Sequence, residues 1–181
     1  RNARIRLVWD YGVKNEEESI ERAVQAALRS DVAVVVVGLE EGEFRDRGYL
    51  TLPGRQEELI NRVAATGKPT VVVLIGGSAV VMSEWIDNVQ SILNAWYPGE
   101  EGGNAVADVL FGDYNPSGKL PITYPIDEAQ LPLNYSHKPT GRSDDYLNLT
   151  GEPLFPFGYG LSYSEFDYRD LKIEPVSGHT S

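Results

Sequence analysis

The chain has 181 residues, of which 41% are hydrophobic and 24% charged, and this is ordinary for one globular domain with its own core. Its net charge of −11 disfavours nucleic acid as a partner, because an acidic surface repels phosphate backbones. The longest apolar runs, at residues 32–37 and 71–75, are too short to cross a bilayer, so we expect no membrane partner. The absence of cysteine excludes disulfides, thiolate metal sites and a cysteine nucleophile.

The first half of the chain alternates between strand and helix patterns. Alternating apolar residues predict a half-buried strand at residues 4–10, and helical spacing predicts an amphipathic helix over residues 16–29. The β-branched run at residues 32–37 has no polar break, which predicts a strand buried on both faces, as in a parallel sheet. A second helix is predicted from about residue 55 to Gly67, where Lys68-Pro69 ends it.

The same alternation continues to residue 125. Residues 70–75 and 89–95 are predicted strands, residues 105–111 a helix, and residues 120–124 a final short strand at an edge of the sheet, because it contains Pro121. Residues 79–86 are ambiguous between helix and loop. This order predicts an α/β fold, a mostly parallel sheet with helices on both faces (an α/β sandwich) over residues 13–125.

The composition changes after Pro125. Aromatic residues lie among glycine, proline and aspartate without a helical period, so residues 126–165 are predicted to be a long loop segment that wraps on the domain. Residues 166–173 read as the first strand of another β domain, which would continue to residue 181. Residues 1–12 are interpreted as the end of a preceding domain or a linker.

A densely charged loop follows the predicted strand at residues 32–37. Its charged residues are Glu40, Glu41, Glu43, Arg45, Asp46 and Arg47. In open α/β sheets ligands bind beyond the carboxyl ends of the strands, so one of these carboxyl groups could act as a general acid/base with a pKa set by its neighbours. A solvated charged loop without a function is the alternative, and the charge pattern alone leaves both interpretations open.

Other kinds of site have weaker support in the sequence. Neither G-x-G-x-x-G nor G-x-x-x-x-G-K-[ST] is present, so nucleotide binding is disfavoured. Ser78 follows a predicted strand but lacks the G-x-S-x-G turn of serine hydrolases, and the two histidines, His137 and His179, form no metal-ligand cluster. Trp96 and Tyr97 could line a sugar pocket, but packing under the turn that follows them is the favoured interpretation.

Five segments, taken in order, resemble one family. They are DVAVVVVG, EFRDRGYLTLPGRQEELI, GKPTVVVLIGG, AWYPGEEGGNAVADVLFGDYNPSGKLPITYP and FPFGYGLSYSEF. They are similar to the family 3 glycoside hydrolases, the β-glucosidase and β-xylosidase group. The resemblance implies the α/β sandwich domain that packs on a (β/α)8 barrel in these enzymes. It also implies a PA14-like insert before this segment and a fibronectin-III-like domain that begins near Phe166.

The resemblance also implies a division of the active site. The barrel would supply the nucleophilic aspartate, and the loop after the first strand of this domain would supply the acid/base glutamate. The motif match places that role on Glu43, with Glu41 as the alternative. Asp46 and Arg47 match the Asp-Arg pair of the motif, which is expected to hold the loop in shape and to line the sugar site. No metal or cofactor is implied.

The expected function is therefore part of a retaining β-glycosidase, foremost a β-glucosidase, that removes terminal non-reducing β-linked sugars. Its partners would be a β-linked oligosaccharide or an aryl or alkyl β-glycoside and the barrel, with a homo-oligomer left open. A secreted or periplasmic location is favoured over a cytoplasmic one. The alternative is a non-catalytic carbohydrate-binding or interaction module with the same fold.

Overall fold

The structure, a computed structural model, describes residues 16–141 and 144–173. The strand predicted at residues 4–10, and with it the proposed end of a preceding domain at residues 1–12, lies outside the described residues.

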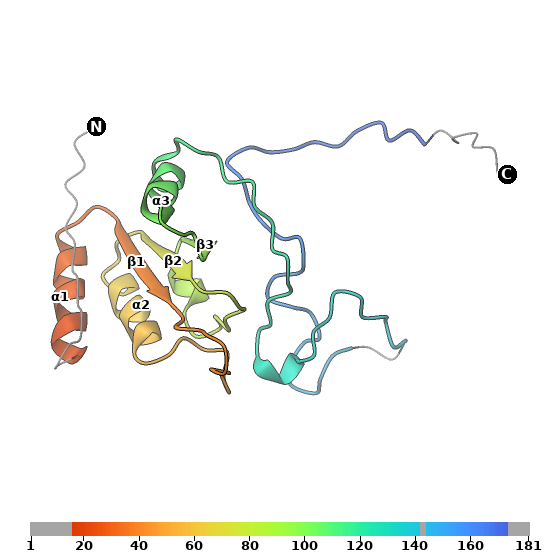
Figure 1. Ribbon diagram of the computed structural model, residues 1–181, viewed down its shortest axis with the longest axis horizontal. Helices are drawn as coiled ribbons and strands as arrows, with labels where there is room; N and C mark the ends of the chain where they lie inside the picture. The colour runs from red at the N-terminus through yellow and green to blue at the C-terminus, as the bar shows by residue number, and fades with distance from the viewer. Residues whose placement is uncertain (1–15, 142–143, 174–181) are drawn as a thin grey trace.

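Three parallel strands form the central sheet in the order β1-β2-β3 (Figure 1). They are β1 (Ala33–Gly38), β2 (Thr70–Ile75) and β3 (Ser91–Trp96). Their β-branched runs suit a pleated sheet, and Val72 of β2 lies opposite Val35 of β1 on one side and Ile92 of β3 on the other. The parallel α/β architecture predicted from the sequence is confirmed.

The core lies between one face of this sheet and two helices. These helices are α1 (Glu16–Leu28) and α2 (Gln56–Ala64), which pack against each other beside β1 (Figure 1). Val35 and Leu74 from the sheet meet Ile60 and Val63 of α2 in one buried cluster, to which α1 adds Ala27. The apolar positions of both helices therefore face the sheet, and their charged residues are left outside.

The other face of β1 is exposed, so the prediction of a strand buried on both faces is wrong. Val34 is 47% exposed and Val36 62% exposed, whereas Val35 and Val37, which alternate with them along the strand, are buried. Side chains alternate along a strand, and α1 and α2 cover only one of the two faces. The remaining helix, α3 (Gly102–Phe111), packs against β3 at the opposite edge of the sheet, so no described helix covers Val34 and Val36.

The ambiguous segment at residues 79–86 is a loop that leads into a short 3-10 helix, η1 (Ile86–Asn88). Its side chains explain the ambiguity, because Val80, Met82 and Trp85 are at most 2% exposed and belong to the core cluster. The sequence signal was therefore burial, which does not by itself distinguish a helix from a packed loop.

Residues 120–124 do not join the sheet as the predicted strand. Instead they pair with the chain near Phe155: Tyr124 forms an isolated antiparallel bridge with Phe155, and the Leu120 amide donates to the Tyr159 carbonyl at 2.8 Å. Pro121 and Pro156 lie between these two points and have no N–H to donate, so a continuous ladder cannot form.

The long segment at residues 126–165 runs beside the sheet on the side away from α1 (Figure 1). It begins with a 3-10 helix, η2 (Glu128–Gln130), and is organised around Gln130, which is 3% exposed. The Gln130 side-chain oxygen accepts from the Ile126 amide, and its NH2 group donates to the carbonyls of Thr150 and Glu152 at 2.8 and 2.9 Å. One buried side-chain amide thus joins a nearby backbone group to two that are 20 and 22 residues away.

Residues 166–173 contain no strand, although the sequence pattern predicts one there. Phe166, Tyr168 and Leu171 are at least 71% exposed, so this part of the chain has no packed neighbour among the described residues. A fibronectin-III-like domain beginning here stays a prediction, since residues 174–181 lie outside the described residues.

Candidate active site

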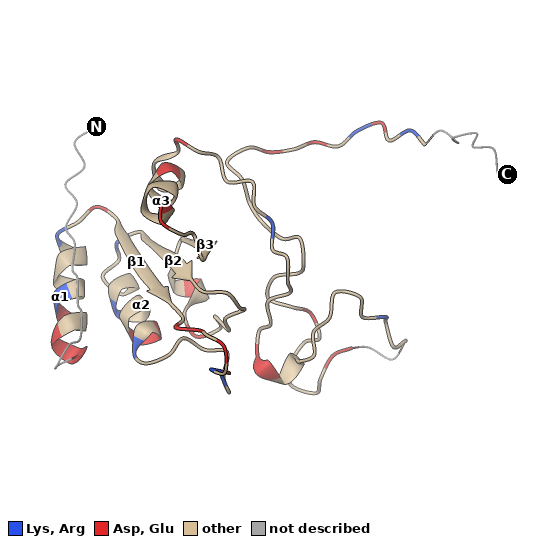
Figure 2. Ribbon diagram, in the orientation of Figure 1, with Lys and Arg blue, Asp and Glu red and all other residues tan. Residues whose placement is uncertain are grey.

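The charged loop, residues 39–51, leaves the carboxyl end of β1, where Figure 2 shows acidic residues followed by a basic tip. Its start is fixed by Gln56, the first residue of α2. The Gln56 side-chain oxygen accepts from the Gly38 amide at 2.7 Å, and its NH2 group donates to the Gly38 carbonyl at 2.9 Å. The last residue of β1 is therefore held by a side chain from the helix that follows the loop.

The end of the charged loop is fixed by a different set of contacts. The Leu50 amide donates to a Glu128 carboxylate oxygen at 2.6 Å, and the Leu50 carbonyl accepts from the Val81 amide at 3.0 Å. Leu52 is 4% exposed, and its amide donates to Glu57 at 3.1 Å. Both ends of the loop are thus anchored, while residues 42–46 between them are exposed.

Glu41 lies at the carboxyl ends of the neighbouring strands. Its carboxylate accepts hydrogen bonds from the Gly77 amide and the Tyr97 hydroxyl, both at 2.6 Å, and from the Ser78 hydroxyl. Gly77 and Ser78 follow β2, and Tyr97 follows β3. The Glu41 side chain is only 20% exposed, so these donors surround it closely.

This setting keeps Glu41 ionised. Partial desolvation, the largest single influence, raises the pKa of Glu41, but the hydrogen bonds from Ser78, Tyr97 and Gly77 together with the charge of Arg47 outweigh it, and the pKa is lowered below 4.5. The Tyr97 hydroxyl responds in the opposite sense: its hydrogen bond to Glu41 raises the pKa of Tyr97 above its ordinary value. At neutral pH Glu41 is a carboxylate and Tyr97 a proton donor.

Arg47 holds the other side of the same cluster. Its guanidinium donates to the Ser78 hydroxyl at 2.7 Å and to the Ala79 carbonyl at 3.0 Å, and its Nε lies 3.7 Å from a Glu41 oxygen. The Arg47 side chain is 18% exposed. Asp46, its partner in the sequence motif, is exposed and forms no hydrogen bond or ion pair with another described residue.

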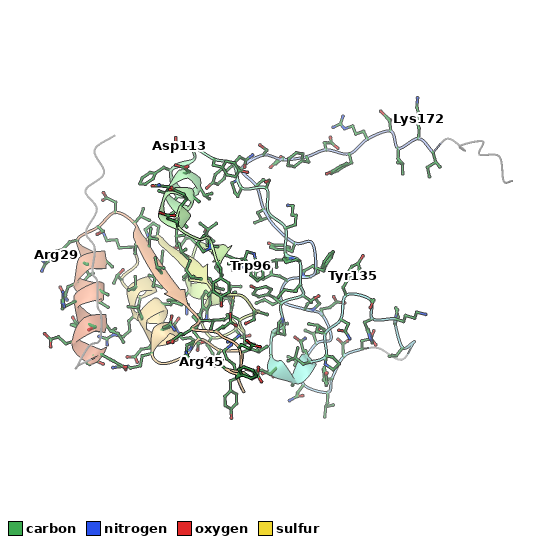
Figure 3. All side chains as sticks on the ribbon, viewed as in Figure 1. Arg29, Arg45, Trp96, Asp113, Tyr135 and Lys172 are labelled. Atoms are coloured by element: carbon green, nitrogen blue, oxygen red, sulfur yellow. The ribbon has the colours of Figure 1, made fainter. Side chains whose placement is uncertain are left out.

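Glu43 occupies the exposed middle of the charged loop. No hydrogen bond or ion pair joins its side chain to another residue of the described part of the chain. Phe44, which follows it, is 94% exposed and has a left-handed backbone with φ of 66°. Arg45 lies at the tip of this loop below the sheet (Figure 3) and pairs with Glu40 at 2.7 Å, with both side chains more than 60% exposed.

The structure therefore separates the predicted site residues into two groups. Glu41 and Arg47 belong to one packed cluster, whereas Glu43 and Asp46 point to no described partner. Sequence reasoning missed Gln56 and Glu128 as anchors of the loop, and it missed Ser78 and Tyr97 as donors to Glu41. The signal for the two donors was available, because both lie just after a predicted strand, at the same sheet edge as the loop.

Tyr97 also corrects a sequence expectation. Packing under the Pro98-Gly99 turn was the favoured interpretation, but Tyr97 is 59% exposed and directs its hydroxyl to Glu41. Trp96 is the residue that packs inward, where its ring and the buried Tyr124 ring form an edge-to-face pair with their centroids 6.5 Å apart.

Among residues 16–141 and 144–173, no group of three or more histidine, cysteine or acidic side chains could hold a metal ion. No described helix is long and apolar enough to span a bilayer.

Residues 4–163 match the family model described as the glycosyl hydrolase family 3 C-terminal domain. The chain is 44% identical over 173 residues to the periplasmic β-glucosidase of Salmonella typhimurium, an alignment that covers 88% of this chain and 23% of that protein. It is 42% identical over 168 residues to a β-xylosidase of Formosa agariphila, covering 89% of this chain and 23% of that protein.

A solved structure agrees in fold. The crystal structure of β-glucosidase from Listeria innocua in complex with isofagomine superposes with a TM-score of 0.82 at 34% sequence identity, over 88% of this chain and 24% of that one. The chain thus belongs to glycosyl hydrolase family 3 and corresponds to the C-terminal domain of that family. It spans about a quarter of the length of the relatives that it matches.

Proposed function

We propose that this chain is the domain of a retaining β-glycosidase that supplies the general acid/base, Glu43, to an active site completed by a (β/α)8 barrel. The substrates would be terminal non-reducing β-linked sugars, in an oligosaccharide or in an aryl or alkyl β-glycoside, and a β-glucoside is the first choice. Relatives named as β-glucosidases and β-xylosidases, each about four times as long as the matched segment, support this proposal.

The observation that carries the choice of residue is the contrast between the two glutamates of the charged loop. Glu41 is enclosed by three hydrogen-bond donors and Arg47, which favour its ionised form, so it is poorly suited to carry a proton. Glu43 is free of such donors among the described residues and stands on the exposed part of the loop. A general acid must be able to reach the leaving group, and the exposed position of Glu43 allows this, whereas the side chain of Glu41 is held by its donors.

The exposed position of Glu43 also explains why a second domain is needed. A carboxyl group in open water has no reason to stay protonated near neutral pH, and acid/base residues gain that property from burial or from a nearby carboxylate. Retaining glycosidases place their two carboxyl groups about 5–5.5 Å apart. Docking of the loop on the barrel would bury Glu43 and bring the nucleophile's charge close to it, which is the setting that acid/base carboxyl groups need.

The reaction then follows the double-displacement scheme. Glu43 donates its proton to the glycosidic oxygen as the barrel's aspartate forms a bond to the anomeric carbon and the bond from that carbon to the leaving oxygen breaks. In the second step the ionised Glu43 takes a proton from water, whose oxygen attacks the same carbon and releases the aspartate. One residue serves as acid and then as base.

Azide rescue of Glu43→Ala tests this assignment. The variant, measured in this chain joined to its barrel domain, should hydrolyse an activated aryl β-glucoside slowly, because the glycosyl-enzyme forms but no base activates water. Azide needs no base, so its addition should restore turnover and yield β-glucosyl azide. Full activity of Glu43→Ala on an unactivated disaccharide, without azide, would refute the role.

The alternative of a non-catalytic sugar-binding module is not favoured, because the matched relatives are named as glycosidases. Calorimetry with glucose or cellobiose on the chain alone distinguishes the two. An isolated binding module would take up the sugar, whereas half of a divided active site is expected to show no measurable affinity.

A further inference from the structure

One carboxylate joins the carboxyl ends of all three strands. Glu41 belongs to the loop after β1, its hydrogen-bond partners Gly77 and Ser78 follow β2, and Tyr97 follows β3. These contacts bridge 36 to 56 residues of sequence, so they are tertiary cross-links and not local turn contacts. The charged loop is therefore tied to the sheet at a point two residues before Glu43.

The surrounding backbone is shaped to this cluster. A Cβ atom on Gly77 would lie 2.6 Å from the Tyr97 ring and 3.1 Å from a Glu41 oxygen, so only glycine leaves room for both. Three non-glycine residues of the described chain have a positive φ, among them Trp96 at 53°, just before Tyr97, and Phe44 at 66°, which follows Glu43 on the exposed part of the loop. Such conformations are costly and are kept where a site needs them.

We propose that Glu41 is a positioning residue, which holds the charged loop so that Glu43 stands at a fixed place for proton transfer to the leaving group. This inference rests on the proposed function, since it takes Glu43 as the acid/base. Glu41 itself touches neither the substrate nor the reacting atoms. It affects the reaction by fixing the charged loop that carries Glu43.

The chemistry of a carboxylate fits this role better than that of an amide. An ionised glutamate only accepts hydrogen bonds, and each of its oxygens can accept two, which matches the donors from Gly77, Ser78 and Tyr97 and the nearby charge of Arg47. A glutamine at this position would turn an NH2 group toward some of these donors and lose the attraction to Arg47. The loop would then lose its central attachment while both of its ends stayed anchored.

Misplacement of Glu43 should affect kinetics differently from a general loss of active-site structure. Poor leaving groups need the proton from the acid, whereas a 2,4-dinitrophenolate leaves without it. In the complete enzyme, Glu41→Gln should lower kcat/KM for cellobiose by about tenfold to a hundredfold, the range expected for a displacement near 1 Å. For 2,4-dinitrophenyl β-glucoside the value should change by less than about twofold, because that step needs no general acid.

Two further variants sharpen the test. Tyr97→Phe removes one donor to Glu41 and keeps the ring, so it should show the same selective loss on a smaller scale. Glu40→Gln is the matched control, because it removes a neighbouring carboxylate that is 88% exposed and pairs with the exposed Arg45. Its kinetics should match those of the unaltered enzyme with both substrates.

The outcomes separate this inference from the assignment of Glu43. If Glu43→Gln loses activity on cellobiose but Glu41→Gln behaves like Glu40→Gln, the positioning role is wrong and the acid/base stands. If Glu41→Gln loses activity equally on both substrates, its role is structural and the inference fails. If azide rescues Glu41→Ala while Glu43→Gln keeps full activity on cellobiose, then Glu41 is the acid/base and both proposals are overturned.

Discussion

The side chain of Gln56 pairs with both backbone groups of Gly38 on the open edge of β1. The Leu39 amide donates to the Ile75 carbonyl of β2, and backbone groups of successive residues point to opposite edges of a strand, so those of Gly38 face away from β2. Gln56 accepts from and donates to Gly38 at 2.7 and 2.9 Å there. At the residue before the charged loop, the Gln56 side chain thus provides the two backbone hydrogen bonds that a neighbouring strand would otherwise provide.

Replacing Gln56 by alanine should therefore destabilise the protein. Two partly buried backbone groups would lose their partner, which costs about 1–3 kcal/mol in the free energy of unfolding. Urea unfolding measures this value. Gln25→Ala is the control, since Gln25 bonds only an exposed glutamate of its own helix and its loss should change stability by less than about 0.5 kcal/mol. Equal losses of unfolding free energy in the two variants would show that the contact between Gln56 and Gly38 contributes no more than an exposed hydrogen bond.

Gly77→Ala tests how closely the Glu41 cluster is packed. The added methyl group would meet the Tyr97 ring at 2.6 Å, so the ring must move away from Glu41, and we expect a loss of about 1–3 kcal/mol in stability. Gly103→Ala in α3 is the comparison, because no atom outside its chain neighbours and the adjoining backbone of its own helix lies within 4 Å of the new methyl group, and alanine favours a helix. Thermal unfolding should show a lower Tm for the first variant only; a Gly77→Ala protein as stable as the parent would contradict the described packing.

The lowered pKa of Glu41 predicts a pH dependence of stability. A carboxyl group that is more acidic when folded stabilises the protein above its ordinary pKa of 4.5, and this contribution is lost as the pH falls below 4.5 through the folded value. The difference in unfolding free energy between the parent and Glu41→Gln should be constant near neutral pH and shrink below pH 4.5. A difference that stays the same at acidic pH would mean that Glu41 titrates normally.

The two faces of β1 should respond differently to truncation in this chain. Val35→Ala removes buried methyl groups that touch the core, and about 1.5–3 kcal/mol of stability should be lost. Val36→Ala removes methyl groups from a side chain that is 62% exposed, and the loss should be below about 1 kcal/mol. Chemical denaturation of both variants compares them directly. A large cost at Val36 would show that its face of the sheet is covered.

Much of the fold could be read from the sequence because local patterns decided it. The helical spacing over residues 16–29 and the uninterrupted β-branched runs at residues 32–37 and 70–75 became α1, β1 and β2. The sequence pattern did not show which face of each strand would be covered by other elements. A run of valines is compatible with burial on one face or on two, and only the placement of the helices decides that Val36 is exposed.

The candidate site was predictable in position but not in detail. The charge run after a parallel strand located the loop, and the rule that such loops meet at the carboxyl edge holds for Glu41, Ser78 and Tyr97. The choice among adjacent glutamates depends on which side chain turns inward. That is decided by donors supplied from residues 36 to 56 positions away, which a local pattern does not contain.

The most direct test of the account is an aryl β-glucoside assay on this chain alone, on the chain together with the barrel domain, and on the same combination carrying Glu43→Gln. We expect no hydrolysis by the chain alone, hydrolysis by the combination, and loss of that activity in Glu43→Gln for glucosides with poor leaving groups. Hydrolysis by the chain alone would place the nucleophile within these residues, and full activity of Glu43→Gln would remove Glu43 from the mechanism. Either result would contradict a divided active site completed by this loop.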